Sequence, residues 1–532
     1  MASNEKRTSS YTDYAPVPST SEEATMNVDD MLALAGDFGR YQYLLMLLFS
    51  IINVLSAFHY FAQTFISIEP EHYCANSGLE CSEPDSNGSL VPCSSGWLYN
   101  LTGGFDTVVS ELDWVCNDNW KAPVGQSLFF IGSVIGSLGL GVMADHVGRL
   151  PVLVLSNLLA LIGNIATSFT NHLPEFAASR LLAGIATDTN FFMMYIIVME
   201  YMRPDMRTLG LNLCIGVFYC VGCVAVPWVA LVSSEWRRFL WFVSAPLLLV
   251  PGYYWLLPES ARWLINKGRI AEAVGCFQRI AAFNGRGEIP SSAIDNFKAT
   301  SEKCCSQTSA SLVGLFRTPR LRRKTCILIF KSMVLTLCYD AISRNVEDMG
   351  YSPFEVFSIS SATILPSCVV ILLLQDRVGR KAMASASLLF TGLFIGSAGV
   401  IQAFQGNDTN ALMTVALGVV GRFGVNIAYN SGAQYAAELI PTEVRGQGVA
   451  FVHVAGYAAT FFSPHILYLA SYWRAIPELI LGTLSTMGAA LCLLLPETMN
   501  KALPLTLADG EDFGEGEGIW EFACCKKEES DP

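Results

Sequence analysis

Five charged side chains interrupt long apolar segments of this 532-residue sequence: Arg180, Asp188, Lys331, Asp340 and Arg422. A charge at the centre of a membrane helix costs about 2.5–3.5 kcal/mol on insertion scales, so such residues default to the interior of a bundle, where they meet a charged partner or solute. The carboxylates of Asp188 and Asp340 suit an ammonium group, and Lys331 suits the carboxylate of a zwitterion. Arg180 and Arg422 begin equivalent segments, and a structural role for them is as well supported as a substrate role. The predicted chemistry is reversible binding of an ionic solute.

Catalytic and cofactor motifs do not stand out in the sequence. It has no Gly-x-x-x-x-Gly-Lys-Ser/Thr phosphate loop, its six histidines are scattered without metal-ligand spacing, and no nucleophile lies in a recognisable pattern with a base. We therefore expect neither an enzyme nor a protein with a metal or another cofactor. His59 is a candidate proton relay, with a hydrogen-bonded core histidine as the alternative.

The elements that position these residues are membrane helices. The sequence is 52% apolar and 15% charged, with a mean hydropathy of +0.40, which is too apolar for an ordinary soluble protein. Twelve segments are long enough to cross roughly 30 Å of hydrocarbon as helices. They are 42–65, 122–144, 151–169, 175–200, 208–232, 239–257, 325–346, 354–375, 382–404, 411–437, 447–471 and 476–495. The net charge of -13 lies partly in an acidic tail and excludes a nucleic-acid partner.

Basic residues orient the chain. With both termini in the cytoplasm, only five of the 33 Lys and Arg fall in outer segments. These five are Lys121, Arg237, Arg238, Arg344 and Arg474. Because cytoplasmic segments of membrane proteins are enriched in Lys and Arg, we expect cytoplasmic termini and a plasma-membrane location. Residues 1–41 lack the features of a signal peptide and are expected to form a disordered cytoplasmic head.

The segment 66–120 is an expected extracellular cap. It carries four cysteines, which allow three disulfide pairings that the sequence does not distinguish. The cysteines are Cys74, Cys81, Cys93 and Cys116. Two glycosylation sequons begin at Asn87 and Asn100, and another begins at Asn407 in a short outer loop. Cysteines and sequons both indicate an oxidising compartment.

The chain contains an internal duplication. Asp145, Gly148 and Arg149 recur 231 residues later, and both Glu200–Arg207 and Pro258–Ser260 have counterparts 238 residues later. The counterparts are Asp376, Gly379, Arg380, Glu438–Arg445 and Pro496–Thr498. We therefore expect an all-α membrane protein with two pseudo-twofold six-helix halves. The halves are 42–257 and 325–495, followed by an acidic cytoplasmic tail over 496–532, and a linker with short helices over 258–324 joins them.

These motifs resemble those of the major facilitator superfamily, and finer ones resemble the organic cation/carnitine transporter family. The finer motifs are 29–42, Pro70–Cys74, Gly96–Tyr99, Pro258–Leu264 and Glu438–Arg445. The resemblance covers about residues 29–504. Within the family, the chain resembles an insect member near the carcinine or β-alanine carriers. It implies an alternating-access secondary transporter for small organic amines, cationic or zwitterionic, that acts as a monomer in contact with membrane lipid.

Charges at the cytoplasmic ends of the segments are expected to form a latch that pairs in only one transport state. The latch residues are Asp145, Arg149, Glu200, Arg207, Asp376, Arg380, Glu438 and Arg445. Topology and helix capping are the alternative explanation. Leu150 replaces the basic residue that usually follows Arg149, so the first latch is expected to be weaker than the second.

The resemblance and the depth of each segment assign Tyr60, Tyr339, Tyr429 and Tyr457 to a cavity wall, with Asn430 as a polar neighbour. Aromatic faces attract ammonium groups without the desolvation cost of a full ion pair. Core packing is the alternative for each ring.

Two departures from the family pattern bear on the substrate. Neutral Tyr457 stands seven residues before Pro464, where family members carry a charge, and Ile364 stands two residues before Pro366, where an acid is common. The acids inside the apolar segments are the nearest substitutes, which favours amines, including zwitterions whose carboxylate meets Lys331. An organic anion transporter or exchanger and a non-transporting solute receptor are the alternatives.

Overall fold

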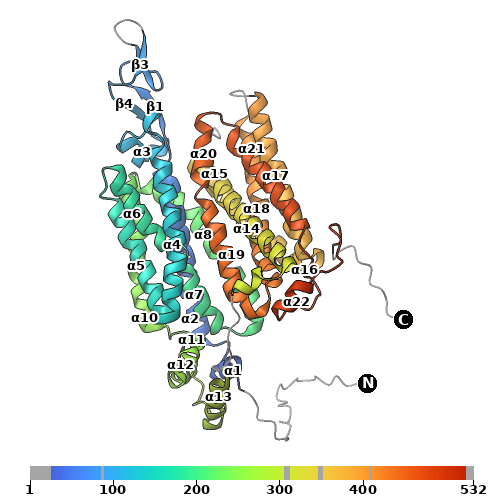
Figure 1. Cartoon of the computed structure of the whole chain (residues 1–532). Helices are drawn as coiled ribbons and strands as arrows, with labels where there is room; N and C mark the ends of the chain where they lie inside the picture. The colour runs from blue at the N-terminus through green and yellow to red at the C-terminus, as the bar shows by residue number, and fades with distance from the viewer. Residues whose placement is uncertain (1–25, 85–88, 305–311, 346–350, 406–409, 523–532) are drawn as a thin grey trace, which may run out of the picture.

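The computed structural model describes residues 26–84, 89–304, 312–345, 351–405 and 410–522. Two helical bundles stand side by side, and a small β-containing cap rises from one end of the first bundle (Figure 1). The helices α1 (Val28–Ala35) and α22 (Leu507–Asp512), near the described ends of the chain, lie towards the other end. We call these the cap end and the terminus end.

The first bundle, or N half, contains the apolar helices that precede the linker. Its elements are α2 (Arg40–Ile66), α4 (Lys121–Val147), α5 (Arg149–Thr167), α6 (Leu173–Ile185), α7 (Thr189–Glu200), α8 (Pro204–Ser233), α9 (Trp236–Ser244), the 3₁₀ helix η3 (Ala245–Gly252) and α10 (Tyr253–Leu256). Helices predominate because every backbone N–H and C=O in lipid must find its partner within the segment. Pro246 and Pro251 lie in η3, which explains the tighter turns there.

The second bundle, or C half, repeats the pattern. Its elements are α14 (Pro319–Arg344), α15 (Pro353–Ala362), α16 (Ile364–Val378), α17 (Arg380–Gln405), α18 (Ala411–Leu439), η6 (Thr442–Val444), α19 (Arg445–Thr460), α20 (Ser463–Tyr468), η7 (Leu469–Ser471) and α21 (Ile476–Leu493). The linker provides α11 (Ala261–Asn266), α12 (Ile270–Phe283), α13 (Ser291–Cys304) and η4 (Leu312–Phe316).

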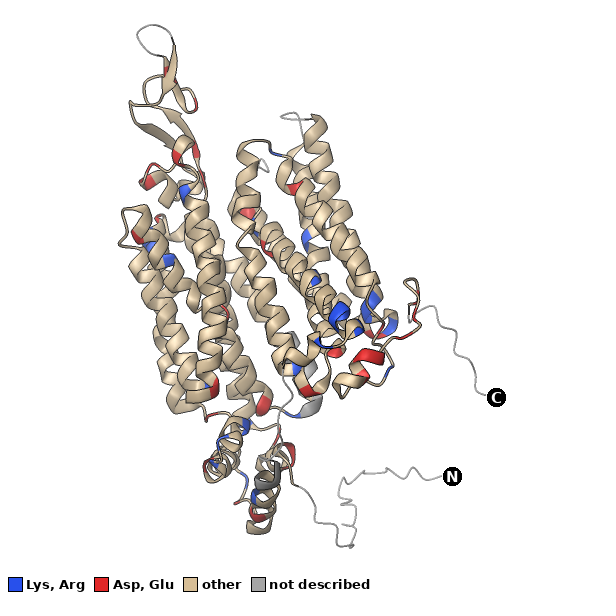
Figure 2. Ribbon diagram, in the orientation of Figure 1, with Lys and Arg blue, Asp and Glu red and all other residues tan. Residues whose placement is uncertain are grey.

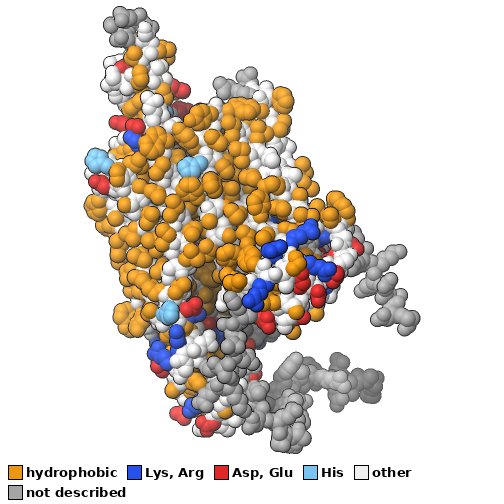
Figure 3. Space-filling model, viewed as in Figure 1, with side chains coloured by type: hydrophobic (Ala, Val, Ile, Leu, Met, Phe, Trp, Pro, Cys, Tyr) orange, Lys and Arg blue, Asp and Glu red, His pale blue; other side chains and the backbone are white. Residues whose placement is uncertain are grey.

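Within these described ranges, eleven helical spans are long and apolar enough to cross a membrane. The twelfth expected segment, 447–471, is divided into α19 and α20, which are 16 and 6 residues long. Pro464, at the start of α20, has no N–H to continue the ladder of α19. The prediction of two six-helix halves is therefore confirmed, with one interrupted segment. Hydrophobic side chains cover the middle of the face shown in Figure 3, whereas charges gather towards the terminus end.

Small residues let the helices of the N half approach closely. A Cβ at Gly184 of α6 would collide with the carbonyl of Phe129 in α4, and one at Gly136 of α4 would collide with the carbonyl of Ile185. Such contacts are typical of membrane helix pairs, where packing replaces the hydrophobic effect. Across the halves, α8 packs on α15 and α4 packs on α19.

The cap contains two antiparallel strand pairs, β1 with β4 and β2 with β3. Its elements are β1 (Glu71–Cys74), β2 (Ser82–Pro84), β3 (Leu90–Pro92), β4 (Trp97–Asn100), η1 (Thr102–Gly104), α3 (Val108–Glu111) and η2 (Cys116–Asp118). The two predicted disulfides are present and pair Cys74 with Cys93 and Cys81 with Cys116.

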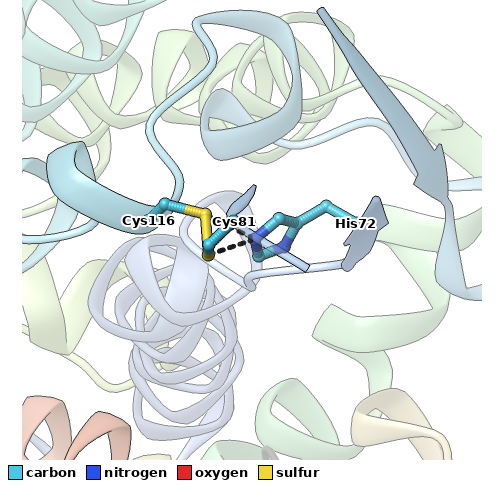
Figure 4. Close-up of side chains that lie close together, drawn as sticks. All are labelled: His72, Cys81 and Cys116. Carbon is cyan, nitrogen blue, oxygen red and sulfur yellow. Dashed lines mark hydrogen bonds between the residues drawn. A yellow bond between two sulfur atoms is a disulfide. The ribbon is translucent and has the colours of Figure 1, made fainter. Parts of the chain in front are cut away.

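His72 lies against the second of these disulfides (Figure 4). Its Nε2 atom is 3.3 Å from Cys116 Sγ and 3.7 Å from Cys81 Sγ. The three groups are close enough together to hold a metal ion. Since the sulfur atoms are bonded to each other, they lack the thiolate charge with which cysteine binds metals.

The head and the tail both dock on the bundle. Within the expected disordered head, α1 (Val28–Ala35) is helical because Asn27 caps it and its apolar residues pack on α12; residues 1–25 lie outside the described part. In the tail, α22 (Leu507–Asp512) packs on the start of α14. Glu511 accepts hydrogen bonds from the backbone of Arg320 and Leu321, where acidic and basic residues meet in Figure 2.

Candidate functional site

An acid and a histidine meet across the two halves. Asp188 lies in the short break between α6 and α7, and His453 lies on α19. His453 Nε2 is 3.2 Å from Asp188 Oδ1, while Ser137 of α4 donates a hydrogen bond to Asp188 Oδ2 at 2.9 Å. The side chains of Asp188 and His453 are 13% and 32% exposed. This pair therefore joins the two halves at a site that protein only partly covers.

Aromatic rings surround the pair. The His453 ring lies 4.9 Å from that of Tyr457, one turn further along α19, and 5.9 Å from that of Phe192 on α7. On the C-half side, Tyr429 of α18 is within hydrogen-bonding reach of Tyr457 and lies 4.6 Å from Tyr339 of α14, ring centre to ring centre. We call Asp188, His453, Tyr339, Tyr429 and Tyr457 the interface cluster. It combines one carboxylate with several ring faces.

The other predicted acid, Asp340, has a strong partner. It forms a fully buried ion pair with Arg344, one turn later on α14, with 2.8 Å between Oδ1 and Nε. Tyr60 donates its hydroxyl hydrogen to Asp340 Oδ1 at 2.6 Å, and Arg344 donates to Thr64 Oγ1 at 2.7 Å and to the Tyr60 carbonyl at 3.0 Å. Because Tyr60 and Thr64 lie on α2, this network joins the halves near the cap end.

The basic candidates lie within single halves or beside aromatic rings. Lys331 is buried and donates to the carbonyl of Gly432 at 3.0 Å, with the Tyr435 ring 5.8 Å away. Arg180 donates to Asn164 at 3.1 Å. His59, the candidate proton relay, is buried in the N half beside the Ala183 carbonyl.

Arg422 is buried between the halves, 5.4 Å from the Phe357 ring and 5.9 Å from the Phe61 ring. It also lines a cavity with Asn345 and Ser360. Asn430, the predicted polar neighbour, has an exposed side chain that donates to the backbone of its own helix.

The predicted latch residues form ion pairs inside each half at the terminus end. Arg149 pairs with Asp145 at 2.9 Å, and Arg380 pairs with Asp376 at 2.9 Å and with Glu438 at 3.2 Å. The side chain of Arg149 thus pairs with one carboxylate, whereas that of its C-half counterpart Arg380 pairs with two.

Two further latch residues have other surroundings. Glu200 accepts from Ser260 Oγ at 2.7 Å. Arg445 donates to the carbonyl of Ile440 at 3.2 Å. The Arg207 side chain is outside the described part.

The duplication is also visible in hydrogen bonds. Glu259 accepts a bond from the Arg149 backbone at 2.8 Å, and Glu497 accepts one from the Arg380 backbone at 2.9 Å. These glutamates belong to the repeated Pro-Glu-Ser and Pro-Glu-Thr motifs. In each half, the motif therefore provides a hydrogen-bond acceptor for the first residue of a helix, α5 or α17.

Two residues of the site were missed by the sequence reasoning. Arg344 was placed in an outer segment, although its position four residues after Asp340 predicts contact on one helix face. His453 stands four residues before Tyr457 and therefore shares the helix face already assigned to the cavity.

Comparisons with known proteins agree with this architecture. Residues 51–505 match the family model described as sugar (and other) transporter. The chain is 29% identical to the organic cation transporter protein of Drosophila melanogaster, over 92% of this chain and 95% of that protein. It is also 30% identical to solute carrier family 22 member 1 of Oryctolagus cuniculus, over 91% and 95%, and 29% identical to organic anion transporter 3 of the same species, over 92% and 94%.

Among solved structures, an inward-open form of the xylose transporter XylE from E. coli is similar in fold. Its TM-score is 0.60 at 17% identity, with 89% of this chain and all of that chain covered. A related XylE structure is described as a major facilitator superfamily proton:xylose symporter. The fold and the sequence together identify a secondary transporter that works by alternating access, and the chain belongs to the sugar (and other) transporter family.

Proposed function

We propose that this transporter moves small organic amines, cationic or zwitterionic, and that Asp188 supplies their counter-charge. The observation that carries the proposal is the contrast between the two acids. Asp340 is held at Oδ1 by the permanently charged Arg344 and by Tyr60, while its Oδ2 makes no hydrogen bond within the described residues; Asp188 instead faces a histidine, which carries a full charge only when protonated. An ammonium group can therefore replace the partner of Asp188 more readily than that of Asp340.

The rings of the interface cluster support an amine. Aromatic faces attract ammonium groups, and Tyr339, Tyr429 and Tyr457 stand on the C-half side of Asp188. A substrate between these rings and Asp188 would touch both halves, so its binding would bias their relative position. The name of the Drosophila relative, organic cation transporter protein, agrees with an amine, whereas one rabbit relative is named organic anion transporter 3.

We place the cap end outside and the terminus end in the cytoplasm of a cell with this protein in its plasma membrane. The disulfides of the cap suit an oxidising compartment. Asn100 has an exposed side chain at the end of β4 and is the glycosylation site we propose. The other two sequons, at Asn87 and Asn407, lie outside the described residues.

Uptake of radiolabelled amines, including carcinine and β-alanine, into cells that express the chain tests the proposal. Asp188→Asn should lower amine uptake about tenfold or more, because a hydrogen bond to a charged group contributes about 1.5–3 kcal/mol. Glu272→Gln is the matched control, since Glu272 lies on the exposed surface of the linker and pairs with Arg269, three residues earlier on the chain. Both variants must be compared at equal surface expression.

Normal amine uptake by Asp188→Asn would contradict the assignment. Binding of an amine without accumulation inside the cell would instead indicate a receptor on a transporter scaffold.

An organic anion is the second candidate. Arg422 is buried, and its Nε and Nη1 atoms make no hydrogen bond within the described part of the chain. A carboxylate would satisfy them. If cells accumulate only organic anions and Arg422→Gln abolishes this uptake, a basic site with Arg422 and Lys331 replaces the amine site.

A further inference from the structure

The Asp188–His453 pair also links the two halves of the transporter. It crosses the interface between the halves, at 3.2 Å, and both partners are partly accessible. By contrast, the buried Arg344–Asp340 pair lies inside one helix, and the Arg149–Asp145 and Arg380–Asp376 pairs at the terminus end each lie inside one half. The two halves must move past each other during transport, so this pair must break or change partner in each cycle.

We propose that the transporter exchanges amines for protons: an arriving ammonium group displaces the His453 imidazolium from Asp188, and His453 then releases its proton. This inference rests on the proposed amine site and adds its energy source. Imidazole is the side chain whose charge changes between pH 5 and 8 under ordinary conditions. The side chain of His453 is 32% exposed, so protein does not enclose it on every side.

Asp188 is held in a way that suits a change of partner. Ser137 donates to its Oδ2 atom at 2.9 Å from α4, inside the same half, while Oδ1 faces His453. The carboxylate therefore keeps its position when one cation leaves and another arrives. Phe192 and Tyr457, which flank the imidazole, offer ring faces to the arriving ammonium group.

The surroundings of His453 leave Asp188 as its main charged neighbour. Helix α4 carries titratable side chains only at its ends, at Lys121, Asp145 and His146. The titratable groups that face His453 along α19 and from α18 are the phenols of Tyr457 and Tyr429.

The remaining charged groups packed on α19 are engaged elsewhere. On α14, Lys331 is held by the Gly432 carbonyl and Asp340 by Arg344. Glu438, Glu443 and His465 stand at the ends of the neighbouring segments, and Arg422 lies beside Phe357. The charge of His453 is therefore controlled by the occupant of Asp188.

The proton balance makes the exchange electroneutral. In the state open to the cap side, the amine binds Asp188 as a cation, and one proton leaves His453 to that side. After the halves rearrange, the amine leaves to the terminus side, and His453 takes up one proton there. The carrier returns with Asp188 paired to protonated His453. One positive charge moves each way, so no net charge crosses the membrane.

Full-length protein in liposomes tests the exchange, with radiolabelled tetramethylammonium and choline as probes. These quaternary ions have no dissociable proton, so any proton that moves passes through the protein. An inside-acidic gradient should raise uptake several-fold and should produce proton efflux, read by an internal pH dye. A potential of about 100 mV, inside negative and set by potassium and valinomycin, should change uptake little.

His453→Asn should keep part of the uptake but lose its response to the pH gradient, and the uptake should become voltage-driven. His172→Gln is the control, because His172 is exposed in the turn before α6 and should leave the pH response unchanged. If His453→Asn does not fold, the wild-type measurements decide alone.

Three outcomes separate the two proposals. Uptake that needs Asp188 but follows voltage, without proton movement, overturns the exchange and keeps the amine site. A pH response that survives in His453→Asn also overturns the exchange. If the wild type takes up neither quaternary ion nor any other amine, the proposed function fails and the exchange fails with it.

Discussion

Thr64 provides a selective perturbation of the closed cap end. Its hydroxyl accepts a hydrogen bond from Arg344 Nη1 at 2.7 Å, and this bond runs from α2 in the N half to α14 in the C half. Thr64→Val removes the acceptor and leaves the buried Arg344–Asp340 ion pair inside α14. The change therefore weakens the contact between the halves without leaving a carboxylate unpaired.

The expected size follows from the type of bond. A hydrogen bond to a charged group contributes about 1.5–3 kcal/mol. Because this bond exists only while the cap end is closed, its loss should shift the equilibrium towards the cap-open state by about the same free energy. At about 1.4 kcal/mol per factor of ten, the open population should rise about ten- to a hundredfold.

Thiol labelling from the cap side measures this population. Ser127 is buried and contacts the Phe461 carbonyl and His465 across the halves, at 3.3 Å and 3.1 Å. A cysteine introduced by Ser127→Cys should react with an impermeant maleimide only when the cap end opens. In that background, Thr64→Val should increase the labelling rate by the factor given above.

Thr391→Val is the matched control for the labelling experiment. Thr391 is also a buried helical threonine, but its hydroxyl bonds to the Ser387 carbonyl within α17. The control should label at the background rate. Equal rates for Thr64→Val and Thr391→Val would refute the idea that the Thr64–Arg344 bond helps to keep the cap end closed.

Three further predictions concern the two ends of the molecule. Arg380→Ala should slow turnover more than Arg149→Ala, with little change in substrate affinity, because Arg380 contacts two carboxylates and Arg149 one; turnover and equilibrium binding would be measured separately. Cys81→Ser should destabilise the cap by about 2–5 kcal/mol. Amide hydrogen exchange should become faster in β1 and β4 and should stay unchanged in α17, which serves as the control. The hydrogen bond from Arg320 lowers the pKa of Glu515. The contribution of this pair to docking of the tail should therefore be fully present above the usual glutamate range and should be lost as the pH falls through the lowered pKa. Protease sensitivity of the tail that does not rise in acid would contradict this.

The architecture could be predicted from the sequence because a bilayer sets the length of a crossing helix. Apolar segments of the right length gave the spans, and the repeated Asp145–Arg149 and Asp376–Arg380 motifs gave the two halves. The break between α19 and α20 has a local cause at Pro464, which the hydropathy of 447–471 conceals. The pairing of the cap cysteines depends on the register of the cap strands, and the number of cysteines alone does not determine that pairing.

The candidate site was only partly predictable. The ion pair of Asp340 with Arg344 is a contact of one helix turn and lies in the local sequence pattern. By contrast, the contact of Asp188 with His453 depends on how two bundles dock, and these residues are 265 positions apart. Hydrophobic periodicity shows which face of a helix is buried, but not which residue of another half it meets.

The distribution of charge pairs suits a protein whose halves must separate repeatedly. Breaking a buried ion pair is strongly unfavourable, by about 3–5 kcal/mol when one partner is lost. Arg344 and Asp340 avoid this cost because their pair lies within α14. When the cap end opens, this network loses hydrogen bonds to α2 but keeps its ion pair.

Asp188 and His453 do not have that protection, since each half supplies one partner. Their separation leaves a carboxylate without its cation unless another positive charge takes the place of the imidazolium. In the exchange we propose, an ammonium substrate supplies that charge at the moment when the halves must move. The proposed amine site would then make the movement of the empty carrier depend on a proton, and the movement of the loaded carrier independent of it.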